Sequence, residues 1–224
     1  MVRFTHWITT LCFFAMLVSG LEIVVSHPRF YWGETGNVLT PPLFSIPIPA
    51  SRATVPTGYG YTLPDQNGWS RSLHFQAAWA AVFIGLLYFL WGLFSGHFRQ
   101  TLIPSPADGG SLLHEIGEHL RFKKPEAGEA SSYNTVQRLA YLGVIFVLAP
   151  LMVWTGLAMS PAVAGVFPWA VAMLGGQQSA RTIHFFGTLL LVLFVLIHVV
   201  MVIRAGFGSR TGAMITGRAP ARKE

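Results

Sequence analysis

Four long stretches of the 224-residue sequence contain no Asp, Glu, Lys or Arg, apart from Glu22 near the end of the first. They cover residues 7–25, 74–96, 139–159 and 182–203. A helix of about 20 apolar residues crosses the roughly 30 Å hydrocarbon core of a bilayer. The sequence therefore predicts an all-α integral membrane protein, folded as a four-helix transmembrane bundle. Only 11% of the residues are charged, against about 25% in an average soluble domain, which excludes a soluble globular protein.

The spans and the segments between them are expected to form a single domain over residues 1–224. Its parts outside the spans are a cap rich in Pro, Gly and aromatic residues, a second loop and a tail, at residues 26–70, 97–138 and 204–224. A short interfacial helix is expected near residues 112–120, where Leu and Ile recur at helical spacing. Residues 161–176 are apolar but too few to span, and they are expected to form an interfacial or re-entrant segment with short helices.

The first span is expected to be permanent. Its apolar run is too long for a signal peptide, and the "VVSHPRF" that follows it has no small-residue cleavage site. The only cysteine, Cys12, lies inside this span. No disulfide or thiolate metal site can therefore form within one chain.

The distribution of basic residues predicts the orientation. Four spans place both termini on the same side, and Lys and Arg gather on the cytoplasmic side. Of the 15 basic residues, eleven lie in the N-terminus, the second loop and the tail: Arg3, Arg99, Arg121, Lys123, Lys124, Arg138, Arg204, Arg210, Arg218, Arg222 and Lys223. The other four are Arg29, Arg52, Arg71 and Arg181. Both termini are thus predicted to be cytoplasmic and the cap periplasmic, and the net charge of +6 reflects this orientation and not nucleic-acid binding.

Eight histidines are present, and their predicted depth separates them. Four lie in loops or at a span end and are not expected to be ligands: His27, His97, His114 and His119. The segment "HEIGEH" spaces its histidines five residues apart, whereas a zinc-protease helix needs four. The other four lie within or at the ends of the spans: His6, His74, His184 and His198. Ionisable side chains there are costly and indicate functional sites, although a hydrogen bond to a neighbouring helix would explain any one of them alone.

The spacing of these four histidines predicts two pairs at different depths. His184 and His198 are 14 residues apart, which gives about four helical turns, about 21 Å of rise and nearly the same face. The last span runs from the periplasm inward, so His184 is the outer of the two. His74 begins the second span at the outer level, and His6 begins the first span at the inner level. His74 therefore pairs with His184, and His6 with His198.

Histidine pairs on facing helices of a bundle are typical ligands of a cofactor in its core. Two axial imidazoles leave no open position on a haem iron, so such a centre transfers electrons. Zinc would need four ligands around one point, which histidines at two depths do not provide. The sequence therefore predicts two haems, an outer one held by His74 with His184 and an inner one held by His6 with His198.

Small and basic residues accompany the predicted haem sites. Gly20 follows His6 by 14 residues on the same helix face and is predicted to leave room for the outer macrocycle; Gly85 and Gly187 could act likewise. Four arginines suit the haem propionates, namely Arg71 and Arg181 at the outer pair and Arg3 and Arg204 at the inner pair. Basic residues at span ends are also expected from orientation alone.

Several motifs resemble the bacterial cytochrome b561/nickel-hydrogenase cytochrome b superfamily. They are "RFTHW" and "SGLEI" in the first span, "YNTVQR" before the third, and the final span with histidines 14 residues apart. The outer "SHPRFYWGETGN" and the tail "AMITG" are similar to the thiosulfate-reductase-type branch, which is often associated with a periplasmic molybdopterin enzyme. The resemblance implies haem b as the cofactor, the same four histidine ligands and a multi-pass protein of the bacterial inner membrane.

The resemblance also implies a quinone near the inner haem. The Tyr-Asn-x-Gly-Gln stretch of formate dehydrogenase is matched by Tyr133, Asn134 and Gln137, close to His198, while Val136 replaces the Gly. Contacts that require a residue without a side chain at that position are therefore in doubt. Asn134 as a helix cap is the alternative for this polar segment.

The expected function is that of a membrane di-haem cytochrome b subunit. It would transfer electrons between a periplasmic redox subunit, a molybdopterin or iron-sulfur protein docked on the cap, and the quinone pool. Such a chain would be an electron-transfer subunit more than an enzyme by itself. One alternative is a stand-alone b561-type quinone-linked oxidoreductase that reacts at the outer haem. The other is a haem-free transporter or structural protein that uses its histidines as proton relays or helix contacts.

Overall fold

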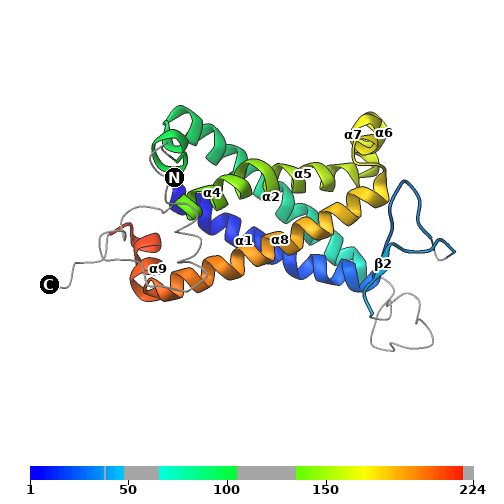
Figure 1. Ribbon diagram of the computed structural model, residues 1–224, viewed down its shortest axis with the longest axis horizontal. Coiled ribbons are helices and arrows are strands. Elements are labelled where there is room, and N and C mark those ends of the chain that lie inside the picture. The colour runs from blue at the N-terminus through cyan, green and yellow to red at the C-terminus, as the bar shows by residue number, and fades with distance from the viewer. Residues whose placement is uncertain (38, 48–65, 105–134, 219–224) are drawn as a thin grey trace. The chain divides into compact units, whose positions relative to one another are not determined.

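The computed structural model describes residues 1–37, 39–47, 66–104 and 135–218, and these are mostly helical (Figure 1). Four helices are long and apolar enough to cross a membrane: Val2–Ser26, Gly68–Phe94, Thr135–Ala158 and Gln177–Arg204. The predicted all-α membrane fold with four transmembrane helices is confirmed. Each helix extends beyond the charge-free run that predicted it at one end or both, because a helix continues into the polar interface on either side of the hydrocarbon.

The spans are α1 (Val2–Ser26), α2 (Gln66–Phe94), a third helix in three parts, and α8 (Gln177–Arg204). The third consists of α4 (Thr135–Gly143), the π-helical turn η5 (Val144–Leu148) and α5 (Ala149–Ala158). The remaining helices are η2 (Phe98–Leu102), α6 (Pro161–Val166), α7 (Pro168–Ala172) and α9 (Phe207–Thr216). Strands β1 (Arg29–Phe30) and β2 (Phe44–Ser45) pair antiparallel, with Arg29 opposite Ser45.

The spans expose large apolar side chains and bury small ones. Leu11 on α1 and Phe83 on α2 are 71% and 65% exposed, which is stable only where lipid covers them. The fully buried positions of the spans include Ser19, Thr155 and Ala180. Small residues at helix contacts let backbones approach closely, as is usual in membrane bundles.

The described chain divides into two compact units. The first comprises Val2–Leu87 and Leu151–Phe186, and the second comprises Met1, Tyr88–Pro150 and Gly187–Glu224. The first contains α1, most of α2, most of α5, α6, α7 and the start of α8. Each unit is described by itself below.

In the first unit, the chain after α1 is fastened to the first turns of α8. The carbonyl of Gly33 accepts the backbone N–H groups of Gln178 and Ser179 at 3.0 and 3.2 Å. In return, Ser179 Oγ accepts the N–H of Gly33 at 2.7 Å, and Thr182 Oγ1 donates to the carbonyl of Tyr31 at 2.7 Å. The bonds from the backbones of Gln178 and Ser179 satisfy N–H groups that a helix start leaves without intrahelical partners.

Gly176 permits this close approach. Its φ is +116°, and a Cβ at this position would lie 2.4 Å from the carbonyl carbon and oxygen of Gly33. No side chain fits there. The segment Gly33–Glu34 can therefore reach the start of α8 only because Gly176 has no side chain.

The segment predicted to be interfacial or re-entrant, residues 161–176, folds as α6 and α7 followed by a glycine turn. Within the first unit it packs around a small core of Ala158, Val171, Leu174 and Ala180. The indole N–H of Trp154 donates to the carbonyl of Ala170 at 3.0 Å. The other predicted interfacial helix, near residues 112–120, lies outside the described residues.

In the second unit, η2 packs against the end of α2 and against the third span. The buried ring of Phe98 lies 5.1 Å from that of Phe146, and a Cβ on Gly92 would lie 2.5 Å from the Phe98 ring. The π-helical turn η5 interrupts the third span at Val144–Leu148. Turns of this kind are frequent at functional sites, although η5 contains none of the predicted site residues.

Candidate functional site

Two of the predicted ligands meet inside the first unit. His74 on α2 and His184 on α8 have ring centroids 6.3 Å apart and ring planes at 60°. Two imidazoles on opposite sides of one metal, each with a metal–nitrogen bond of about 2 Å, have ring centres roughly 6 Å apart. The separation of these two rings therefore fits a pair that shares one metal atom.

Each of these imidazoles is held by a hydroxyl from a neighbouring helix. Ser19 Oγ on α1 lies 3.0 Å from His74 Nδ1, and Thr155 Oγ1 on α5 lies 2.9 Å from His184 Nδ1. Both hydroxyl residues are fully buried. The sequence prediction contained neither, although each hydroxyl precedes a glycine inside a predicted span, as "SG" and "TG".

These glycines bring two backbones against the imidazole edges. A Cβ on Gly20 would lie 3.6 Å from His74 Cε1, and a Cβ on Gly156 would lie 3.6 Å from His184 Cε1. Gly20 was predicted to lie beside the outer centre, and the structure places it next to His74. A Cβ on Gly85 would have nothing within 4 Å, so no close approach depends on that glycine.

The arginines predicted at the outer pair lie in different surroundings. Arg181 donates to the carbonyl of His27, and its guanidinium lies 4.9 Å from the centre of the Phe30 ring. It therefore ties the cap to α8. Arg71 is exposed on α2. Their contacts to haem propionates remain a prediction.

The predicted inner ligands belong to different units, so their pairing remains a prediction. His6 is on α1 in the first unit, where its ring packs edge-on against Trp7 at 5.2 Å. His198 is on α8 in the second unit, stacked on Phe194 at 6.0 Å and edge-on to Tyr141 at 6.3 Å. The two arginines predicted at the inner pair are Arg3 near the start of α1 and Arg204 at the end of α8.

The predicted quinone residues are only partly described. Tyr133 and Asn134 lie outside the described residues, and Gln137 is half-buried on α4. His97 directly precedes η2 and lies among aromatic rings, with the ring of Trp91 at 5.0 Å. Burial lowers the pKa of His97 below its ordinary value, which favours the neutral ring at pH 7.

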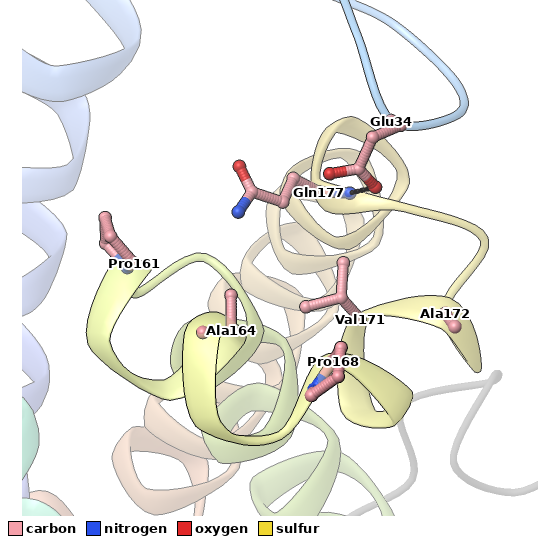
Figure 2. A pocket seen from close by; sticks show the side chains of 8 residues that line it. Glu34, Pro161, Ala164, Pro168, Val171, Ala172 and Gln177 are labelled. Carbon is pink, nitrogen blue, oxygen red and sulfur yellow. Dashed lines mark hydrogen bonds between the residues drawn. The ribbon is translucent and has the colours of Figure 1, made fainter.

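A pocket of about 480 Å³ lies on the first unit beside α6 and α7 (Figure 2). Its lining consists of Glu34, Pro161, Ala164, Gly165, Pro168, Val171, Ala172 and Gln177. The carboxylate of Glu34 accepts the backbone N–H of Gln177 at 3.2 Å, the dashed line in Figure 2. None of the predicted ligands lines this pocket, so it is distinct from the histidine pair.

The donor set on the described residues also limits the kind of metal. Among residues 1–37, 39–47, 66–104 and 135–218, no three His, Cys, Asp or Glu side chains gather closely enough to hold one ion. A tetrahedral zinc site needs four such ligands, whereas a haem iron needs only two axial ones. The pair of His74 and His184 therefore fits a haem.

A model of the prokaryotic cytochrome b561 family matches residues 1–217. The chain belongs to this family. Because the members are b-type cytochromes, the chain binds b-type haem and serves as a membrane electron-transfer subunit. Its four apolar helices together with its family place it in the bacterial inner membrane as a multi-pass protein.

Curated relatives cover most of this cytochrome b561. A putative protein-methionine-sulfoxide reductase subunit YedZ1 from Azospira oryzae is 29% identical over 206 residues, which are 90% of this chain and 87% of the relative. Probable Ni/Fe-hydrogenase B-type cytochrome subunits of Cupriavidus necator and Azotobacter vinelandii are 25% and 27% identical, over 96% of this chain and 81% and 82% of theirs. No solved structure matches the chain significantly. All three relatives are named as subunits, which supports a redox partner subunit for this chain.

Proposed function

We propose that this cytochrome b561 carries two b-type haems and transfers electrons between a periplasmic redox subunit and the quinone pool. His74 and His184 hold the outer haem, and His6 and His198 hold the inner one. The observation that carries the proposal is the 6.3 Å separation of the His74 and His184 rings across two spans. A b-type haem held by two imidazoles exchanges single electrons without an open position for oxygen chemistry.

The residues around the outer pair suit this role. Ser19 and Thr155 orient the two imidazoles, and Gly20 and Gly156 leave the space beside Cε1 of each ring free of a side chain. Apolar spans exclude water, which lowers the dielectric around the haem and contributes to its redox potential. The chain therefore supplies ligands, orientation and a dry surround.

The partner is proposed to be a molybdopterin or iron-sulfur protein that docks on the periplasmic cap. The subunit names of the relatives favour a complex over the stand-alone oxidoreductase. The cap is bonded directly to the first turns of α8, the helix that carries His184. The α8 residues in these bonds are only two to six positions from His184. A partner that binds the cap would therefore lie near the proposed outer haem ligand.

The quinone is proposed to bind near the inner haem, beside Tyr133, Asn134, Gln137 and His198. Gln137 is half-buried on α4, and a side-chain amide can donate to a quinone carbonyl. Arg3, Arg204, Arg71 and Arg181 remain proposed partners of the haem propionates.

The haem content of the purified chain tests the proposal. We expect the pyridine haemochrome assay to give two b-type haems per chain and addition of a quinol to reduce them. A single haem per chain would contradict the two-site arrangement. Full turnover by the isolated chain, without a copurifying subunit, would favour the stand-alone alternative.

Enlarging Gly156 is expected to exclude the outer haem. A leucine would extend beyond a Cβ that already lies 3.6 Å from His184 Cε1, the carbon next to Nε2. We expect Gly156→Leu to lower the haem content from two per chain towards one, measured against protein mass. Gly143→Leu is the matched control, since a Cβ at this span glycine meets nothing within 4 Å. Unchanged haem content in Gly156→Leu would contradict this placement of the macrocycle.

A further inference from the structure

We propose that Ser19 and Thr155 are positioning residues that fix the tautomers of the outer haem ligands and lower the potential of that haem. This inference rests on the proposed ligand pair of His74 and His184. It assigns a role to two hydroxyls on helices that carry neither ligand of that pair.

The hydroxyl protons have acceptors within their own helices. Ser19 Oγ lies 2.7 Å from the carbonyl of Ala15 and 3.2 Å from that of Met16. Thr155 Oγ1 lies 2.8 Å and 3.2 Å from the carbonyls at the equivalent positions, Leu151 and Met152. A hydroxyl has one proton and two lone pairs, and a carbonyl can only accept. Each hydroxyl therefore donates to its own helix and accepts from the imidazole.

The direction of this bond decides the tautomer. With the proton on Nδ1, each imidazole has its lone pair on Nε2, the nitrogen that is left to bind iron.

Such a bond also changes the electronic character of the ligand. When an acceptor takes the Nδ1–H of a metal-bound imidazole, the ring becomes a more basic ligand. A more basic ligand stabilises ferric over ferrous haem, which lowers the midpoint potential. If both imidazoles hold the haem, the bonds of Ser19 and Thr155 would act on its potential in the same direction. The outer haem is thus tuned by α1 and α5, through Ser19 and Thr155.

The test compares variants that keep the shape and change the hydroxyl. Thr155→Val and Ser19→Ala remove the hydroxyl, whereas Thr155→Ser keeps it. We expect the first two to shift the midpoint potential of the outer haem to more positive values in a redox titration, and Thr155→Ser to retain the native potential. The affinity for the outer haem is expected to fall by about 10-fold or more without the hydroxyl. Thr10→Val is the matched control, because Thr10 Oγ1 donates to the carbonyl of His6 four residues earlier, at 2.8 Å, as an intrahelical hydroxyl of the same kind.

The outcomes separate this inference from the proposed function. His184→Ala, prepared in parallel, identifies the outer haem by its loss. If that variant loses one haem while Thr155→Val and Ser19→Ala keep native potentials and haem affinity, the positioning role is wrong and the ligand pair stands. If His184→Ala keeps both haems, the ligand pair itself is wrong. If Thr155→Val loses the haem and Thr155→Ser keeps it, the hydroxyl role is supported; loss in both variants would indicate a purely steric role and overturn it.

Discussion

His184→Ala is expected to remove one of two b-type haems and to leave the other spectrally unchanged. The imidazole of His184 is the proposed outer ligand on α8, and its ring centre lies 6.3 Å from that of His74. Alanine supplies no donor, so only one of the two imidazoles proposed to hold this haem would remain. The haem-to-protein ratio should therefore fall by half, and the difference spectrum of dithionite-reduced protein should lose one α-band component.

The reciprocal variant His198→Ala should lose only the other haem, because His198 lies 14 residues further along the same uninterrupted helix. His97→Ala is the control, since this histidine lies outside the proposed ligand set and hydrogen-bonds Thr101 Oγ1 at 3.3 Å. It should keep both haems. Retention of both haems in His184→Ala and in His198→Ala would show that these histidines serve as helix contacts or proton carriers.

Gly176→Ala is expected to detach the cap from α8 and to destabilise the first unit. At φ +116° an L-residue is strained by about 1–3 kcal/mol, and a methyl 2.4 Å from the Gly33 backbone adds steric repulsion. The free energy of unfolding should therefore decrease by more than the roughly 1–3 kcal/mol that the backbone strain alone costs. Thermal denaturation in detergent is monitored through the haem Soret band. The variant should begin to lose this band at a clearly lower temperature than the wild type.

Gly165→Ala provides the comparison for this effect. Gly165 is in the short helix α6, and a Cβ there meets nothing within 4 Å. Alanine in a helix is favoured over glycine by up to about 1 kcal/mol, so this variant should be neutral or slightly more stable. Equal stability of Gly176→Ala and the wild type would contradict the close approach of the two backbones.

The membrane fold could be predicted from sequence because lipid imposes a simple requirement. A span needs about 20 residues without charge, and the four runs that meet this condition correspond to the four long helices. The depth of His74 and His184 in the membrane could also be predicted. Consecutive spans alternate in direction, so the second and the last span begin on the same side. The structure brings these two rings together in the first unit.

The hydroxyls of Ser19 and Thr155 could not be predicted in this way. Serine and threonine inside membrane helices commonly bond to the carbonyl of the preceding turn, so a pattern of residues gives no sign that an imidazole shares the same oxygen. The contact depends on how α1 faces α2 and how α5 faces α8. That arrangement comes from packing, which periodicity does not encode.

The cap was equally beyond prediction in detail. Its richness in Pro and Gly indicated an irregular segment, but the bonds between Gly33 and the start of α8 join residues 146 positions apart. Arg181 remains a proposed partner of a haem propionate. It also bonds to the carbonyl of His27, a contact that only the folded cap creates and that the sequence did not indicate.

The fastening of the cap to α8 also has a consequence for biosynthesis. The chain emerges from the ribosome in order, and the cap segment around Tyr31 precedes its partner Thr182 by 151 residues. Loop closure over such a distance has to await the last span. The contacts of the cap are therefore completed only when α8 has been inserted, and in the same step His184 reaches the level of His74. Closure of the cap and maturation of the outer haem site would thus be one event, late in assembly.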